Sequence, residues 1–240
     1  MIEYILLGIL SGIFLSATGG GWGPIIVPVL ILFGFNPMVA KGVTLTSDVF
    51  VTGSSSFLHK RANNVRKNLS CALLLGVLGA ILGAGISNFI SAKSFRIFIG
   101  VFEIILGSML IGIKPRKLIN LEANEGFHLA ASIGFLAGFF KGFFGAGWGP
   151  MGVSLLILFG VTSKKVIGSS LVARLFISGS AAIYYALSNY VFWDVSLSLI
   201  IGGILGSLIG VSIVRNINEE DLRTIIGVVI FLLGVLILLF

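Results

Sequence analysis

Five charged side chains occur within stretches of the sequence that are otherwise apolar. They are Lys41, Asp48, Glu103, Lys141 and Arg174. A charge inside a membrane-spanning segment costs roughly 2.5 to 3.5 kcal/mol on insertion scales, so such a residue usually faces a partner or an interior cavity. The residue types indicate an ion site, with three cations that could attract an anion and two carboxyl groups that could balance charge or carry a proton.

Asp48 and Arg174 occupy corresponding positions of a repeated sequence, 126 residues apart. Polar side chains recur around both at helical spacing, which places each set on one helix face. The two faces comprise Lys41, Thr44, Asp48, Thr52 and Ser55, and Ser170, Arg174 and Ser178. We expect these faces to line one substrate path, in which Arg174 attracts an anion and Asp48 balances it when the site is empty. The alternative is a buried ion pair that only fixes the packing of the two halves.

The three remaining charges each allow two interpretations. Lys141, within the stretch FFKGFF, could supply positive charge to a bound anion or could snorkel to the membrane interface. Lys41 lies near the start of its helix, and for it we expect snorkelling. Glu103 has the apolar Ile230 as its counterpart in the second half. It could bind and release a proton during transport, or it could be a neutral, hydrogen-bonded core group.

A glycine-rich stretch occurs twice in front of similar apolar runs, as GGGWGP from Gly19 and as GAGWGP from Gly145. Glycines that lead into a proline are typical of an interrupted helix followed by a fresh helix start. Inside a membrane such backbone is tolerated only where protein or a wet cavity surrounds it, and its free N–H groups suit an anion. The alternative is that the glycines only permit close helix packing.

We therefore expect both breaks, from Gly19 to Pro24 and from Gly145 to Pro150, to be non-helical and to meet around a central cavity. The residues of the breaks that we assign to substrate binding are Gly19, Gly21, Trp22, Gly23, Gly145, Gly147, Trp148 and Gly149. With them we group Thr44, Asp48, Lys141, Ser170 and Arg174, and Glu103 as the proton-coupling candidate. No metal site or cofactor is expected.

The elements that must position these residues are membrane-spanning helices. Hydrophobic residues make up 57% of the 240 positions and charged residues 10%, which leaves too little polar surface for a soluble globule. Apolar stretches are long enough to cross a hydrocarbon core of about 30 Å, and the alternating pattern of a barrel is missing. The sequence predicts an all-α polytopic membrane protein with the lipid bilayer as its surroundings and a retained first helix. Because the net charge of +7 comes mostly from loop residues, no nucleic-acid partner is implied.

The chain divides into two related halves. Between positions 19–34 and 145–160, eleven of sixteen aligned residues are identical, and the register continues almost to the end. We assign residues 1–113 to the first transmembrane repeat, 114–126 to a cytoplasmic linker and 127–240 to the second repeat. Apolar spans are expected at 3–18, 24–35, 38–58, 69–90 and 93–113, then at 127–144, 150–161, 165–187, 195–214 and 222–240. The short second span of each half either folds back as a re-entrant segment or crosses fully.

Basic residues predict that the two repeats have opposite orientations. The loop HKRANNVRK carries four Lys and Arg residues, whereas its counterpart LSNYVFWDV carries none. Basic loops stay on the cytoplasmic side, so these two loops should lie on opposite faces, as in an inverted repeat. Lys93 and Arg96 would then lie outside and count against this orientation. Small residues such as Gly79, Gly83, Gly206 and Gly210 predict close helix packing within the chain or across a homodimer.

The duplicated G-x-G-W-G-P breaks, the basic loop after the third span and the length of the chain resemble the sulfite exporter TauE/SafE family of membrane permeases. The resemblance covers the whole chain. It implies two related halves and the transport of sulfite, a sulfonate or another small sulfur-containing anion across a prokaryotic inner or plasma membrane.

Two other functions are weighed against an anion transporter. A passive anion channel could use the same breaks and basic residues, and a membrane scaffold would leave the mid-span charges without a purpose. An enzyme is not expected, because the sequence contains no G-x-S-x-G or H-E-x-x-H motif. Its two histidines, His59 and His128, lie at the expected membrane borders, where we expect them to be solvated.

Overall fold

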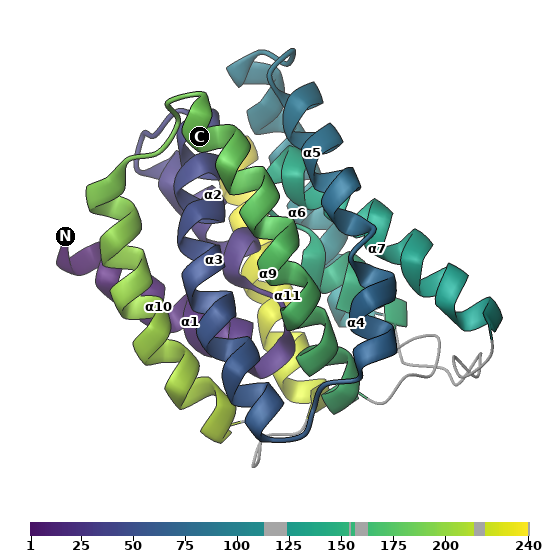
Figure 1. The fold of residues 1–240 in the computed structure, drawn as a ribbon. Helices are drawn as coiled ribbons and strands as arrows, with labels where there is room; N and C mark the ends of the chain where they lie inside the picture. Colours follow the sequence, from purple (N-terminus) through teal and green to yellow (C-terminus); the bar gives the residue numbers. More distant parts are fainter. Residues whose placement is uncertain (113–123, 154, 157–162, 214–218, 240) are drawn as a thin grey trace.

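The computed structural model describes residues 1–112, 124–153, 155–156, 163–213 and 219–239. Within these ranges the chain is helical and contains no strand. Figure 1 shows the arrangement. The helices of the first half are α1 (Ile2–Thr18), α2 (Trp22–Leu32), α3 (Pro37–Arg61), α4 (Lys67–Leu73), α5 (Gly76–Ser87) and α6 (Ala92–Gly112). Those of the second half are α7 (Asn124–Phe144), the π-helix η1 (Trp148–Val153), α9 (Ser163–Leu187), α10 (Trp193–Ile213) and α11 (Glu219–Leu239).

Helices α3 and α9 form the centre of the molecule and run antiparallel (Figure 1). Gly42, near the start of α3, lies against Tyr190 beyond the end of α9, and Gly168, near the start of α9, lies against Asn64 beyond the end of α3. The side chain of Asn36 caps α3 by accepting a hydrogen bond from the backbone N–H of Met38. Each helix has 25 residues, about 37 Å of rise, and carries one of the two polar faces expected from the sequence.

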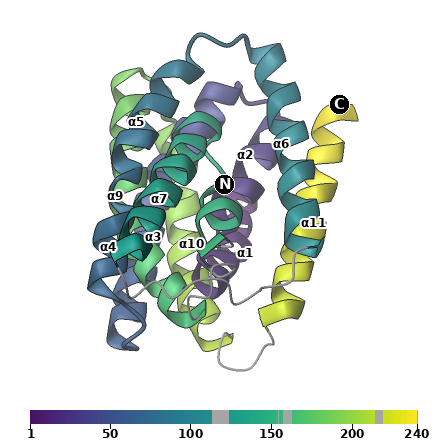
Figure 2. The ribbon, with the colours of Figure 1, turned by 90° about the vertical axis from the view of Figure 1, so that its right-hand side faces the viewer.

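Three further helix pairs surround this centre. Helix α1 packs along α10, and α7 packs along α4 and α5, so the first helix of each half packs against the other half. Helices α6 and α11 pack on each other and form one side of the molecule in Figure 2. Glycines allow the close approach, because a side chain at Gly79 or Gly83 would collide with the backbone of α7, and one at Gly206 with that of α1. The predicted packing role of these glycines within the chain is confirmed.

The predicted fold class is confirmed as all-helical, and the observed ends of the helices agree with the expected spans to within a few residues. Among the described residues, four segments are long and apolar enough to cross a membrane, at Lys67–Ser87, Gly126–Phe144, Lys165–Leu187 and Trp193–Ser212. Helix α2 ends after 11 residues, about half of the hydrocarbon thickness. Half of the expected span 150–161 and most of the linker 114–126 lie outside the described residues.

Corresponding helices of the two halves run in opposite directions where they pack together. This holds for α3 and α9 and for α6 and α11, since Gly100 lies against Gly234 and Gly107 against Gly227. Asn63 and Asn189, which are 126 residues apart, both adopt a positive φ, at 56° and 59°, directly after α3 and α9. An inverted repeat requires such antiparallel pairs, and the inversion relative to a membrane remains a prediction.

Candidate functional site

Each glycine-rich break contains three residues outside a helix. The interruption covers residues 19–21 in the first half and 145–147 in the second. Gly19 and Gly145 have φ angles of 70° and 73°, and Gly21 and Gly147 have φ angles of 86° and 103°. These values lie in the left-handed region that favours glycine, so the repeated glycines preserve the same backbone path. The expectation was wrong for Trp22–Pro24 and for Trp148–Pro150, which already belong to α2 and to η1.

The two breaks touch each other in the interior. A Cβ atom added to Gly149 would lie 2.5 Å from the Cα of Gly20, and one added to Gly20 would lie 2.8 Å from the Cα of Gly149. A side chain at Gly23 would likewise collide with the backbone of Gly145. The sequence-based expectation that the breaks approach one another therefore matches the contacts. A central cavity around them remains a prediction.

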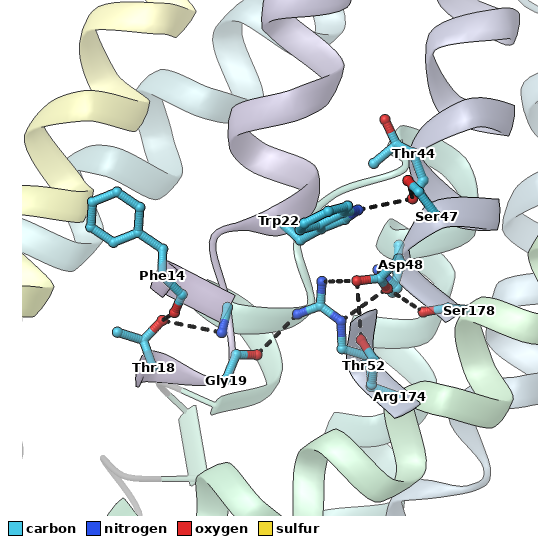
Figure 3. Close-up of polar contacts among 12 residues, drawn as sticks. Phe14, Thr18, Gly19, Trp22, Thr44, Ser47, Asp48, Thr52, Arg174 and Ser178 are labelled. Atoms are coloured by element: carbon cyan, nitrogen blue, oxygen red, sulfur yellow. Dashed lines mark hydrogen bonds and ion pairs between the residues drawn. The ribbon is translucent and has the colours of Figure 1, made fainter. Parts of the chain in front are cut away.

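Asp48 and Arg174 form a two-point ion pair between α3 and α9 (Figure 3). The guanidinium group donates to the carboxylate from Nε at 3.0 Å and from Nη2 at 2.8 Å. Its Nη1 donates to the carbonyl oxygen of Gly19 in the first break at 3.0 Å. Because both side chains are buried, the pair ties the two central helices and one break into a single unit.

The Asp48 carboxylate accepts further hydrogen bonds and a second cation. Thr52 donates to Oδ1 at 3.1 Å, and Ser178 donates to Oδ2. The ammonium group of Lys141, on α7, lies 2.8 Å from Oδ2 as an ion pair. Lys141 is completely buried, so it does not snorkel. The structure thus brings Asp48, Arg174 and Lys141 together, with one carboxylate between two cations.

The two tryptophans of the breaks differ in their hydrogen bonding. The indole N–H of Trp22 donates to the carbonyl oxygen of Thr44 at 3.1 Å (Figure 3). Trp148 is 1% exposed, and its indole N–H has no hydrogen-bond partner within the described part of the chain. The hydroxyl groups of Thr44 and Ser170 donate to backbone carbonyls of their own helices, those of Ala40 and Ile167.

The prediction that Lys41 snorkels to the membrane interface is wrong. It is completely buried, and its ammonium group donates to the carbonyl oxygen of Phe143 at 3.3 Å. The same group lies 5.1 Å from the centre of the Tyr185 ring, which provides a cation–π contact. The helix start of α3 is inserted against the second break, and this tertiary contact cannot be inferred from the position of Lys41 in its helix.

Two residues of this region were missed or misjudged from the sequence. His59, expected to be solvated, is 2% exposed, and its Nε2 pairs with the carbonyl oxygen of Ser16 at 3.0 Å. His128 is exposed, as expected. Tyr185, which no motif singled out, donates to the carbonyl oxygen of Gly142 at 3.0 Å. His59 and Tyr185 are 126 positions apart, as are their two acceptors, so the repeat offset was the signal that could have revealed both.

Glu103 lies on α6, apart from the Asp48 cluster. It is completely buried where α6 packs on Gly234 of α11, and neither of its carboxyl oxygens has a hydrogen-bond partner among the described residues. Both interpretations of Glu103 from the sequence remain predictions. The described residues hold no group of three or more His, Cys, Asp or Glu that could bind a metal ion.

Comparison with known proteins adds the family context. A family model described as "Sulfite exporter TauE/SafE" matches residues 4–237. Among curated proteins, the chain is similar to two from Bacillus subtilis (strain 168). "Probable membrane transporter protein YunE" is 26% identical, with 96% of this chain and 94% of that protein covered. "Probable membrane transporter protein YtnM" is 27% identical, with 98% and 81% covered. An archaeal relative, "Probable membrane transporter protein MJ0441" from Methanocaldococcus jannaschii, is 23% identical, with 98% and 94% covered.

Proposed function

Because the chain belongs to the sulfite exporter TauE/SafE family, we propose that it transports a small sulfur-containing anion, such as sulfite or a sulfonate, across a prokaryotic cell membrane. Its relatives carry names of membrane transporters and none of them names a substrate. The sulfur chemistry therefore comes from the family description, and the anionic character from the charges of the site.

The observation that supports the proposal is the buried cluster of Asp48, Lys141 and Arg174 beside the two touching breaks. Two cations face one carboxylate, so the cluster carries an excess positive charge in a region shielded from water. A buried charge without full compensation is costly, and a bound anion would remove this cost. The site is built from elements of both halves, which allows the movement of one half against the other to open it to either side.

Flux through purified protein in liposomes tests the proposal. We expect saturable uptake of at least one anion among sulfite, sulfate, thiosulfate and methanesulfonate, and none in liposomes without protein. Accumulation against the anion's gradient, driven by an imposed pH gradient, would distinguish a coupled transporter from a passive channel. A protein that folds in liposomes and moves none of these anions would favour the scaffold alternative and contradict the proposal.

Glu103 is the proposed proton carrier. Both of its oxygens are buried without a hydrogen-bond partner among the residues that the structure describes, so the group can exchange a proton only when water reaches it. Such access would accompany an opening of α6 and α11. The variant Glu103→Gln keeps the shape and cannot change its charge. We expect it to retain downhill flux of the anion and to lose acceleration by the pH gradient; an unchanged response to the gradient would contradict the role.

A further inference from the structure

The cation that meets the anion can be identified from the hydrogen bonding of Asp48. An ionised carboxylate offers about four acceptor positions on its two oxygens. In this structure four hydrogen bonds occupy them, two from Arg174 and one each from Thr52 and Ser178. Lys141 approaches as a fifth donor, with its ammonium nitrogen 2.8 Å from Oδ2, and among the described residues this crowded carboxylate is its one acceptor. Asp48 is saturated without Lys141.

Arg174, by contrast, already donates a hydrogen bond to a protein group from each of its three nitrogen atoms. Two of these bonds go to Asp48 and one goes to the Gly19 carbonyl. An anion could reach this guanidinium group only by displacing a two-point, charge-assisted pair, which is among the strongest contacts in proteins. The pair is therefore suited to a structural role.

The repeat has an apolar residue at the position that corresponds to Lys141. The residue 126 positions earlier, at the corresponding place before the first break, is Leu15, which is equally buried. The tryptophans also differ, since the indole N–H of Trp22 has an acceptor and that of Trp148 has none in the described ranges of the chain. Within the described residues, the second break therefore has a tryptophan donor without an acceptor and, beside it, a lysine that shares an already crowded carboxylate, whereas their counterparts in the first break are satisfied and apolar.

We propose that the second break is the anion-binding one, with the Lys141 ammonium group and the Trp148 indole N–H as donors to the substrate oxygens, while the Arg174–Asp48 pair stays closed. This assignment rests on the proposed function. It divides the pseudo-symmetric centre into a structural half and a substrate-binding half.

Binding and stability measured separately on the full chain test the assignment. The probes are sulfite, sulfate, thiosulfate and methanesulfonate, titrated calorimetrically into protein in a non-ionic detergent. Lys141→Leu copies the residue of the first break; we expect it to unfold at an equal or higher temperature and to bind the preferred anion at least about 30-fold more weakly. Lys141→Arg keeps the charge and should retain part of the affinity, and Lys60→Gln, an exposed lysine, controls for net charge.

A matched pair of tryptophan variants tests the second donor. Trp148→Phe removes a donor that none of the described protein groups accepts from, so we expect about 10- to 100-fold weaker anion binding with unchanged stability. Trp22→Phe removes a donor that is hydrogen-bonded to the Thr44 carbonyl, so it should lower stability and leave affinity unchanged.

The outcomes separate the two levels of the proposal. If the unmodified protein binds and moves an anion but Lys141→Leu binds it equally well, the assignment to the second break is wrong and the transport function stands. Failure of Lys141→Leu and Lys141→Met to fold, with Lys141→Arg folded, would also overturn the assignment, because it would make Lys141 a structural counter-charge. If the unmodified protein binds and moves none of the probes, the proposed function itself fails.

Discussion

At the scale of single residues, compensation of buried charge explains the centre of this protein. Asp48 and Arg174 are each tolerable in an apolar interior because the other is present and because hydroxyl and carbonyl groups complete their hydrogen bonds. Their partnership could be predicted from the sequence, since they share a repeat position and a polar face. The saturation of Asp48 could not, because it depends on rotamers and on which donor reaches which oxygen.

A double substitution distinguishes a structural Arg174 from a substrate-binding one. Arg174→Ala removes the two-point partner of Asp48 and should cost about 3 to 5 kcal/mol, seen as a lower yield of folded protein. Asp48→Asn combined with Arg174→Gln removes both charges of the pair and keeps polar contacts, while Lys141 loses its carboxylate partner. We therefore expect it to recover part of the folded yield, together with anion flux. A folded double variant without flux would assign the anion to Arg174 and contradict the role we give to Lys141.

At the scale of elements, glycine decides where helices stop and how closely their ends approach. The repeated glycines predicted the two breaks, and positive φ angles at four of them explain why no other residue type suits these positions. The helical state of Trp22–Pro24 and Trp148–Pro150 could not be predicted, since a proline in the first turn allows a helix to start before it or at it. The burial of Lys41 could not be predicted from the sequence either, because it depends on the contact between α3 and the second break.

A pair of alanine variants measures the contact between the breaks. At Gly149 a methyl group would meet the backbone of Gly20, and backbone cannot move aside as a flexible side chain can. We expect Gly149→Ala to destabilise the protein by about 1 to 3 kcal/mol and to reduce flux. Gly179→Ala, on α9, is the control, because nothing lies within 4 Å of the added carbon. It should not destabilise the protein, since alanine is favoured over glycine within a helix, and it should leave flux unchanged. Equal behaviour of the two variants would show that the breaks do not need to touch.

At the scale of the whole molecule, the duplicated sequence accounts for the arrangement of the helices, and the positions where the two halves differ carry the charged residues of the proposed function. Helices α1 and α7 pack on the opposite half, α3 and α9 cross the centre, and contacts such as His59 with Ser16 recur as Tyr185 with Gly142. Lys141 and Glu103 have the apolar counterparts Leu15 and Ile230. The sequence could therefore predict the arrangement of the helices well. It also showed that Lys141 and Glu103 differ from their counterparts, but not which charged residues lie together. A homodimer remains a prediction.

Cysteine labelling of the two corresponding loops tests the inverted arrangement. In a Cys71→Ser background, Ala62→Cys places a thiol after α3 and Ser188→Cys places one after α9. We expect a membrane-impermeant maleimide applied to intact cells to label one of them, and the other to react only after permeabilisation. Labelling of both from the same side would contradict the inversion.

The most direct measurement locates the anion itself. Selenite is the selenium analogue of sulfite, and its anomalous scattering marks its position in a crystal without reference to the surrounding density. After competition with sulfite flux has shown that selenite is recognised, we predict an anomalous peak within hydrogen-bonding distance of the Lys141 ammonium group, beside the second break, with the Arg174–Asp48 pair intact. A peak held by a displaced Arg174, or one outside the region between the two breaks, would contradict a binding site built on the second break.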